Sequence, residues 1–339
     1  MGMRIGIIIN KFAGSDNKLR LQQKIAMALF RCELHFCIPE NFQELQSFIE
    51  TKILKKQIDN LVICGGDGTV NTCLQHLMRL SVGGETLPSL TIVSSGTAND
   101  LASELGLKKE VETVVRAVLE DSVKKIDVIQ IEANNKKMYM LTNGGIGIAS
   151  MAADMANQIK TKLRKIHKGQ NQSALKTTAL RLGQFAVNKI GKHFYEAIFL
   201  KALQEWSKEN WEIEIEIENQ KKIITKSPFI LINNQPQIGH SFVPAPYTSN
   251  NDGTYNLFIS EMHSPIERLT NVMNIRKGLI FEKNGLNKSF EIKNCKFRSL
   301  NSKRGMIFFG DGEILHRNIF EANISILKQA LSIAVRVPR

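Results

Sequence analysis

Apolar residues in the first third of the chain follow two alternating patterns. Short continuous apolar runs are typical of buried strands, and between them apolar residues recur at helical spacing. The predicted strands are 4–10, 60–64, 90–93 and 124–128. The predicted helices are 17–31, 42–57, 70–80, one starting near 101, and 110–119. Such alternation predicts a parallel sheet with helices on both faces.

After residue 128 the pattern changes to short runs of period two, which indicate antiparallel strands. These strands are predicted at 129–133, 137–143, 211–217, 223–224, 228–233, 253–260, 289–297 and 306–310. We therefore predict an α/β domain over 1–128 and a β-sandwich domain over 129–321. The division leaves open that residues from about 322 to 339 pack back onto the first domain.

A basic, helical insertion is predicted within the second domain, at about 151–206. Lys162, Arg164 and Lys165 are among its many cations, and apolar residues are interleaved with them. A helix that is basic on one side and apolar on the other suits the surface of an anionic membrane. The alternative is a solvated helix pair that packs on its own domain.

Composition narrows the class of protein. The 339 residues carry a formal net charge of +13, which favours a polyanionic partner such as a nucleic acid, an acidic membrane or a phosphorylated substrate. No apolar run is long enough to span a membrane. Five scattered cysteines without a CxxC pair indicate reduced thiols in the cytosol. Only 4 Tyr and 2 Trp, with no RNA-binding signature, weigh against nucleic acid.

The stretch Gly65-Gly66-Asp67-Gly68-Thr69 ends a predicted strand and opens a predicted helix. Free backbone N–H groups and the helix dipole make such a turn an anion site. A carboxylate beside a phosphate is repulsive unless a divalent cation lies between them, and Mg²⁺ is the usual bridge. The stretch fits neither the Walker pattern nor GxGxxG, and alone it could be a structural turn.

Two further turns follow neighbouring strands. One contains Gly96 and Thr97, and the other begins at Asn10 and contains Lys11. Because open α/β sheets bind ligands at the carboxyl ends of their strands, we expect these turns to converge on one site.

Six motifs now resemble those of the diacylglycerol kinase catalytic-domain family of lipid kinases, over nearly the whole chain. They are GGDGTVN at 65–71, SGTANDLA at 95–102, KKIDVI at 124–129, NGGIGIAS at 143–150, NDG at 251–253 and GDGE at 310–313. The resemblance implies an ATP-dependent kinase that phosphorylates a lipid hydroxyl. It also implies an active site in the cleft between a phosphofructokinase-like α/β domain and a β-sandwich.

By this resemblance each site residue has an expected role. Glu313 is the general base, Asp67 acts in catalysis through Mg²⁺, and Asp127 joins a hydrogen-bond network that reaches Asp67. Asp252 binds a structural Mg²⁺. The residues expected to hold ATP are Asn10, Gly65, Gly66, Gly68, Thr69, Gly96 and Thr97. The plainer readings are a turn residue without a role for Glu313, a hairpin turn for Asp252 and a capping residue for Asp127.

Two departures from the family pattern stand out: Lys11 replaces a common proline, and Thr72 replaces a common glutamate. The resemblance favours a cytoplasmic, peripherally membrane-associated enzyme that converts diacylglycerol to phosphatidate. A sphingoid base, ceramide or phosphatidylglycerol remain open as acceptors. An NAD kinase and a non-catalytic nucleotide or lipid sensor are more distant alternatives. The oligomeric state stays open, a homodimer included.

Overall fold

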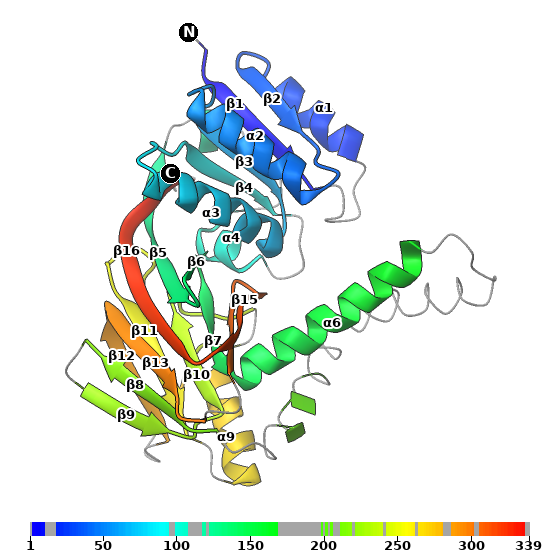
Figure 1. The fold of residues 1–339 in the computed structure, drawn as a ribbon. Coiled ribbons are helices and arrows are strands. Elements are labelled where there is room, and N and C mark those ends of the chain that lie inside the picture. Colours follow the sequence, from blue (N-terminus) through cyan, green and yellow to red (C-terminus); the bar gives the residue numbers. More distant parts are fainter. Residues whose placement is uncertain are drawn as a thin grey trace.

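The computed structural model describes residues 2–10, 18–94, 99–107, 117–119, 122–168, 198, 201–202, 204–205, 211–218, 221–239, 242–261, 264–280, 286–301 and 305–335. Figure 1 shows an upper part with a sheet between helices and a lower part built mainly of strands. The helices are α1 (Lys18–Ala28), α2 (Phe42–Leu54), α3 (Asp67–Val82), α4 (Asp100–Glu104), α6 (Ile148–Lys168) and α9 (Pro265–Arg276). The strands are β1 (Arg4–Ile9), β2 (Glu33–Cys37), β3 (Asn60–Gly65), β4 (Ser89–Ser94), β5 (Val123–Ala133), β6 (Lys136–Met140), β7 (Asn143–Gly147), β8 (Ile213–Ile217), β9 (Lys221–Thr225), β10 (Phe229–Asn233), β11 (Tyr255–Ser260), β12 (Asn287–Ile292), β13 (Asn294–Ser299), β14 (Met306–Gly310), β15 (Glu313–Ile319) and β16 (Glu321–Ala334).

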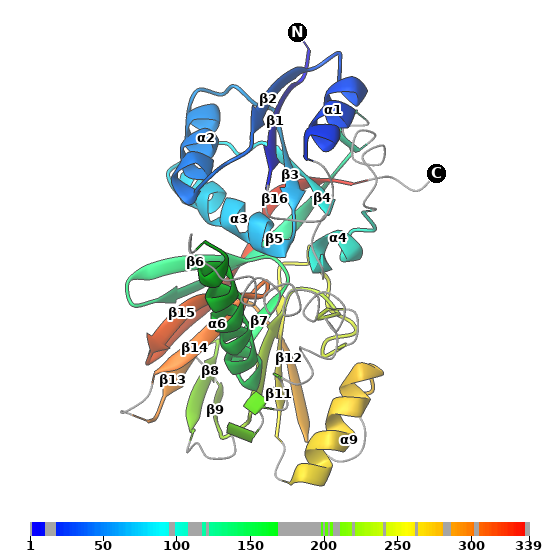
Figure 2. The ribbon, with the colours of Figure 1, turned by 90° about the vertical axis from the view of Figure 1, so that its right-hand side faces the viewer.

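The upper part is a doubly wound α/β unit. Strands β2, β1, β3 and β4 are parallel and adjacent in that order. Successive residues of β1 face opposite sides, so that Ile7 packs with Ile25 of α1, whereas Ile8 packs with Ile49 of α2 and with residues of α3. Figure 2 shows α1 on one face of this sheet and α2 and α3 on the other. The predicted fold class is confirmed for this part of the chain.

The sheet does not stop at β4. Strand β16 pairs in parallel with β4 at Ile333 and antiparallel with β5 and β13, and the sheet then continues through β8 and β9. Strand β5 runs through residue 128 without a break, so the domain boundary predicted there falls inside a strand. Strands β5 and β16 thus form a ribbon that connects the two parts (Figure 1).

A second sheet is wholly antiparallel, in the order β12-β11-β10-β7-β14-β15. Its inner side chains pack against the lower half of the first sheet and form the largest hydrophobic core among the described residues, which includes Ile146, Ile232 and Phe297. The β-sandwich predicted for this region is confirmed.

One strand prediction is wrong. The run 289–297 was expected to form a single strand, but it contains the end of β12 and the start of β13, which belong to different sheets. The chain crosses between the sheets at Lys293. Periodicity did not reveal this crossing because both strands alternate polar and apolar residues.

A buried carboxylate fixes the ribbon. Leu327 lies opposite Val128 and Leu331 lies opposite Ile126, so residues 328–330 of β16 bulge out opposite Asp127. Asp127 is 0% exposed, and its side chain accepts hydrogen bonds from the backbone N–H of Gln329 (2.6 Å) and of Gly253 (2.7 Å). Asp127 therefore holds the bulge and the turn before β11 in place.

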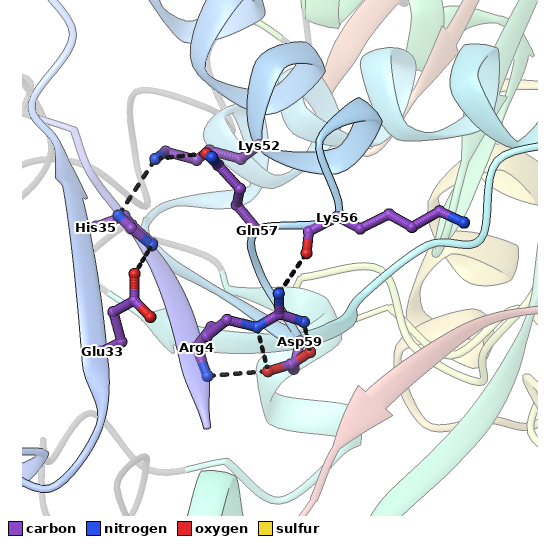
Figure 3. A network of polar contacts seen from close by, with 7 residues as sticks. All are labelled: Arg4, Glu33, His35, Lys52, Lys56, Gln57 and Asp59. Atoms are coloured by element: carbon purple, nitrogen blue, oxygen red, sulfur yellow. Dashed lines mark hydrogen bonds and ion pairs between the residues drawn. The ribbon is translucent and has the colours of Figure 1, made fainter. Parts of the chain in front are cut away.

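At the amino ends of the parallel strands, surface ion pairs and hydrogen bonds hold neighbouring segments together (Figure 3). Arg4 at the start of β1 donates two side-chain hydrogen bonds to Asp59, at 2.6 and 3.1 Å, and one to the carbonyl of Lys56. The guanidinium of Arg4 lowers the pKa of Asp59 below its usual value. Because this network lies at the amino ends of the strands, it offers control positions far from the expected site.

No helix in the described ranges combines the length and the apolar character that crossing a bilayer requires.

Substitution of Asp127 tests the role of the buried carboxylate. Asp127→Asn would place an amide N–H₂ against one of the two backbone donors, so we expect the free energy of unfolding to fall by about 2–4 kcal/mol. Asp252→Asn is the control, because an asparagine can close the same exposed turn. We expect that control to change stability by less than about 0.5 kcal/mol in urea titrations. Equal effects of the two substitutions would contradict the role of Asp127.

Candidate active site

The glycine turn lies where it was predicted, between a buried strand and a helix. Strand β3 ends at Gly65, Gly66 is the N-cap of α3 without a side-chain cap, and Asp67 is the first helical residue. The backbone N–H groups of Thr69 and Val70 donate to the carbonyl of Gly66, at 2.9 and 3.1 Å. The preceding N–H groups of this turn stand at the positive end of a helix of 16 residues, where anions bind favourably.

Thr69 explains one of the glycines. A Cβ added to Gly65 would lie 2.5 Å from the Thr69 hydroxyl oxygen, so the threonine side chain occupies that space. The same hydroxyl accepts a hydrogen bond of 2.7 Å from Nδ2 of Asn10, which follows β1. Asn10 and Thr69 therefore meet at the carboxyl ends of β1 and β3, as the sequence predicted for two turns on one sheet edge.

Asp67 joins two turns. Its carboxylate accepts hydrogen bonds from the backbone N–H groups of Asn99 (2.8 Å) and Asp100 (3.1 Å), at the start of α4. Asn99 has a left-handed backbone (φ 55°), which an asparagine adopts more readily than most residues. This carboxylate thus holds the start of α4 beside the glycine turn.

The environment of Asp67 opposes its negative charge. Burial raises its pKa to about 6, and the carboxylates of Asp100 and Asp311 act in the same direction. A perturbed carboxylate beside a helix N-terminus at a sheet edge is typical of functional sites.

Glu313 comes to this turn from the other part of the molecule. A Cβ added to Gly68 would lie 2.6 Å from Oε1 of Glu313, so the carboxylate rests directly against the backbone of Gly68. Glu313 opens β15 after a turn in which Asp311 (φ 53°) and Gly312 (φ 76°) both have positive φ. That conformation is the one favoured by Asp-Gly in tight hairpins.

Asp311 is a residue to which sequence reasoning gave no role. It is buried, and its carboxylate accepts hydrogen bonds from Nδ2 of Asn71 (2.8 Å), from the backbone N–H of Leu141 (3.1 Å), and from the N–H (2.9 Å) and hydroxyl (2.7 Å) of Thr142. Burial raises its pKa, and the hydrogen bonds from Asn71 and Thr142 oppose that rise. Asp311 therefore ties α3, the β6–β7 turn and the β14–β15 turn together.

Three more contacts join the elements around the site. Oδ2 of Asp100 accepts a hydrogen bond from the N–H of Gly239 (2.9 Å), and this contact joins α4 to the loop after β10. On the other side, Nδ2 of Asn157 in α6 lies 3.5 Å from Oε2 of Glu313. Asp154, one turn earlier in α6, forms an ion pair with Arg317 of β15 at 2.5 Å.

The remaining predicted residues lie elsewhere. The hydrogen bonds of the Asp127 carboxylate go to Gly253 and Gln329, and within the described residues none of them reaches Asp67. The carboxylate of Asp252 is exposed and accepts hydrogen bonds from the N–H and hydroxyl of Thr254, both at 2.9 Å. These contacts match the plainer expectation of a turn for Asp252.

Several predicted residues fall partly or wholly outside the description. Gly96 and Thr97 lie outside the described residues. Helix α6 includes Lys162, Arg164 and Lys165, but only its backbone is described there. The predicted insertion at 151–206 therefore begins within α6, and most of its later part lies outside the described ranges.

A magnesium ion would find a partial set of ligands here. In the described part of the chain no cluster of three or more His, Cys, Asp or Glu could hold a metal. Mg²⁺ bound with a nucleotide, however, usually takes one or two carboxylates and several phosphate oxygens and waters. Asp67, which is partly buried beside other carboxylates, fits that requirement, because a cation would offset the repulsion.

Comparison with known proteins identifies the first part of the chain. Residues 4–131 match the family model described as "Diacylglycerol kinase catalytic domain". The chain is 34% identical over 109 residues to "Probable lipid kinase YegS-like" of Chromohalobacter salexigens, and 28% identical over 116 residues to "Diacylglycerol kinase" of Bacillus subtilis. The first alignment covers 32% of this chain and 32% of the relative, and the second covers 33% and 35%. The chain thus spans about a third of the length of these two relatives.

The fold is similar over a longer range. A crystal structure of a diacylglycerol kinase from Bacillus anthracis superposes with a TM-score of 0.66 and covers 98% of this chain and 97% of that one. At 17% sequence identity this similarity establishes the fold. The match over residues 4–131 places that part of the chain in the diacylglycerol kinase catalytic-domain family.

Proposed function

We propose that this protein is an ATP- and Mg²⁺-dependent kinase that transfers the γ-phosphate of ATP to a hydroxyl group of a membrane lipid. The observation that carries the proposal is the contact of the Glu313 carboxylate with the backbone of Gly68. It brings a candidate proton acceptor from the β-sandwich part against the candidate phosphate site of the α/β part. The family match and the names of the relatives support this choice of chemistry.

The glycine turn binds the triphosphate in this proposal. The bare backbone from Gly65 to Gly68 allows phosphate oxygens to approach the N–H groups at the start of α3. Asn10 and Thr69 border the same sheet edge, and Gly96 and Thr97 would add to it from the next turn. Since phosphoryl transfer depends mostly on positioning and charge stabilisation, fixed main-chain donors supply a large part of the catalysis.

Glu313 takes the proton of the acceptor. As the lipid oxygen forms its bond to the γ-phosphorus, the bond from phosphorus to the β–γ bridging oxygen breaks and ADP leaves. The hydroxyl proton passes to the Glu313 carboxylate, an effect that typically contributes about 10²–10⁴-fold to rate. The hydrogen bonds of Asp311 hold the hairpin that carries Glu313, so Asp311 is a positioning residue.

Asp67 has two roles in this proposal, one toward the metal ion and one in the structure of the site. When bound, Mg²⁺ would supply neutralisation of the phosphate charge beside this carboxylate. Asp67 also keeps α4 against the glycine turn through the N–H groups of Asn99 and Asp100. Both roles would be lost together if the carboxylate were removed.

The lipid acceptor requires contact with a bilayer. We propose that the basic segment starting in α6, with Lys162, Arg164 and Lys165, binds an anionic membrane surface from the cytoplasmic side.

Diacylglycerol is the first acceptor to test, because the resemblance favours it. A sphingoid base, ceramide and phosphatidylglycerol are the other acceptors for a radiolabelled ATP assay in mixed micelles. Transfer to a soluble dinucleotide and to none of these lipids would overturn the proposal.

Replacement of Glu313 should separate chemistry from nucleotide binding. We expect Glu313→Gln to reduce kcat by about 10²–10⁴-fold, because the amide cannot accept the proton. ATP affinity, measured with a fluorescent nucleotide, should change little. Glu321→Gln, on the exposed start of β16, is the control and should retain activity. A Glu313→Gln variant with normal turnover would remove this residue from the mechanism.

Replacement of Asp67 should weaken the binding of nucleotide with metal. We expect Asp67→Asn to lose most of the increase in nucleotide affinity that Mg²⁺ causes, and EDTA to abolish transfer by the wild-type protein. Asp59→Asn, at the opposite end of the same strands, serves as the control. If Asp67→Asn and Asp59→Asn responded equally to Mg²⁺, the metal role of Asp67 would be wrong.

The membrane role of the basic segment can be tested with vesicles. We expect the triple substitution of Lys162, Arg164 and Lys165 by Glu to reduce co-sedimentation with vesicles that contain phosphatidylglycerol. The loss should be greatest at low salt, because surface electrostatics are screened as ionic strength rises. Binding that neither salt nor the substitutions alter would contradict this role.

A further inference from the structure

Buried amide side chains gather at the end of the second sheet that faces the site. Six of their polar atoms, including both of the Asn250 side chain, have no hydrogen-bond partner in the described structure. The residues are Asn143, Asn233, Asn234, Gln235 and Asn250, all at most 3% exposed. A buried polar atom without a partner typically costs about 1–3 kcal/mol, so native proteins supply a partner from water or a ligand.

The orientation of two of these amides is fixed. The N–H₂ groups of Asn143 and Gln235 both donate to the same acceptor, the carbonyl oxygen of Gln237, at 2.5 and 3.0 Å. Two donors on one oxygen bring these side chains close together. Each side-chain carbonyl oxygen, Oδ1 of Asn143 and Oε1 of Gln235, is then left buried without a partner among the described residues. A flip of either amide would lose the contact with Gln237.

Asn233 extends the same row. It lies directly opposite Asn143 in the pairing of β10 with β7, so both side chains are on one face of the sheet. Its N–H₂ group donates to Oδ1 of Asn256 (3.3 Å), and its own oxygen is unpartnered in the described structure. Asn143, Gln235 and Asn233, which we call the amide row, therefore present unpartnered acceptor oxygens and no unpartnered donor, whereas Asn250 has one of each.

The amide row borders the proposed reaction centre. The carbonyl of Asn143 accepts the backbone N–H of Asp311 (3.0 Å), two residues before Glu313. Gln235 and Gln237 belong to the loop whose Gly239 N–H binds Asp100, the residue held by Asp67. The unpartnered oxygens thus lie between the Glu313 hairpin and the loop that contacts α4, on the side from which the β-sandwich part meets the phosphate site.

The chemistry of this row limits what it can bind. Amide oxygens accept hydrogen bonds, so a ligand must bring a hydroxyl or N–H group. The hydroxyl that receives the phosphate gives its proton to Glu313, so a different group has to fill this row. Diacylglycerol has one hydroxyl, and its ester oxygens are themselves acceptors.

We propose that Asn143 and Gln235 recognise a second hydrogen-bond donor on the lipid, next to the hydroxyl that is phosphorylated. The inference rests on the proposed lipid kinase activity and defines its acceptor class. The preferred acceptors are lipids with a vicinal hydroxyl, amine or amide N–H, such as a monoalkylglycerol, a sphingoid base, ceramide or phosphatidylglycerol. Diacylglycerol leaves the amide oxygens unpaired and is a poorer acceptor.

A matched pair of lipids tests the proposal on the wild-type protein. The pair is octadecylglycerol with a free hydroxyl at carbon 2, and the same lipid with that hydroxyl methylated. We expect kcat/KM to favour the free hydroxyl by about 5- to 150-fold, the range that one unsatisfied buried partner corresponds to. Diacylglycerol in the same micelles reports the proposed function independently.

Substitution then assigns the preference to the amides. Gln235→Met keeps the length of the side chain and removes its oxygen, so the preference between the two lipids should fall to about twofold or less. Gln46→Met, on α2, is the matched control and should keep the wild-type preference. Nucleotide affinity should be the same in both variants. Asn143→Ala provides a second test, and thermal melting identifies any variant that does not fold.

The outcomes are distinguishable. A wild-type enzyme that uses both alkylglycerols equally would overturn the proposal, with the amide oxygens then holding only water. A preference that survives in folded Gln235→Met and Asn143→Ala would also overturn it. If the wild-type protein phosphorylates no lipid at all, including diacylglycerol and ceramide, the proposed function itself fails.

Discussion

The buried carboxylate of Asp311 is the constraint on which the arrangement of the site depends. It receives hydrogen bonds from α3 and from the backbone and the Thr142 hydroxyl of the β6–β7 turn, so these two segments and the β14–β15 turn that carries Asp311 are fixed around one charge. A buried charge without such donors would be costly, and the donors exist only when the segments are assembled. The same contacts set the hairpin that presents Glu313 to Gly68. Correct assembly and the proposed chemistry therefore depend on the same group.

Asp67 plays a comparable part on the other side of the site. Each of the two carboxylates accepts backbone N–H groups from a neighbouring turn, and each has a pKa raised by burial. Their mutual repulsion is tolerated because backbone donors surround both of them. The end of the sheet thus carries negative carboxylates beside the positive N-terminus of α3. A ligand that carries both a positive and a negative group would complement this arrangement.

Much of this could be predicted from the sequence. Continuous apolar runs located β1, β3 and β4 because buried parallel strands have no polar face. The glycines at 65, 66 and 68 indicated the turn, and the resemblance named Glu313, whose carboxylate lies against Gly68 of that turn. The pattern failed where glycine replaces side chains, as in β7, whose Asn-Gly-Gly-Ile-Gly sequence has no strand signal.

Long-range pairings were beyond the reach of local patterns. Gln75 of α3 illustrates the reason: its amide accepts the N–H of Tyr139 (3.1 Å) and donates to the carbonyl of Tyr139 (2.7 Å), so it substitutes for a neighbouring strand at the edge of β6. No local sequence pattern near residue 75 predicts that Tyr139 is its partner. Asp127 and Asp311 were visible in motifs, but their partners come from residues far along the chain. The amide row was likewise invisible, because asparagine and glutamine are ordinary surface residues until the fold buries them.

The position of β16 has a consequence for biosynthesis. Its pairing of Ile333 with Leu90 completes the parallel part of the first sheet with a strand that the ribosome makes long after β4. Until then β4 is an open edge that could pair with another chain, and such edges promote aggregation. The parallel part of the sheet can therefore close only after β16 has been synthesised.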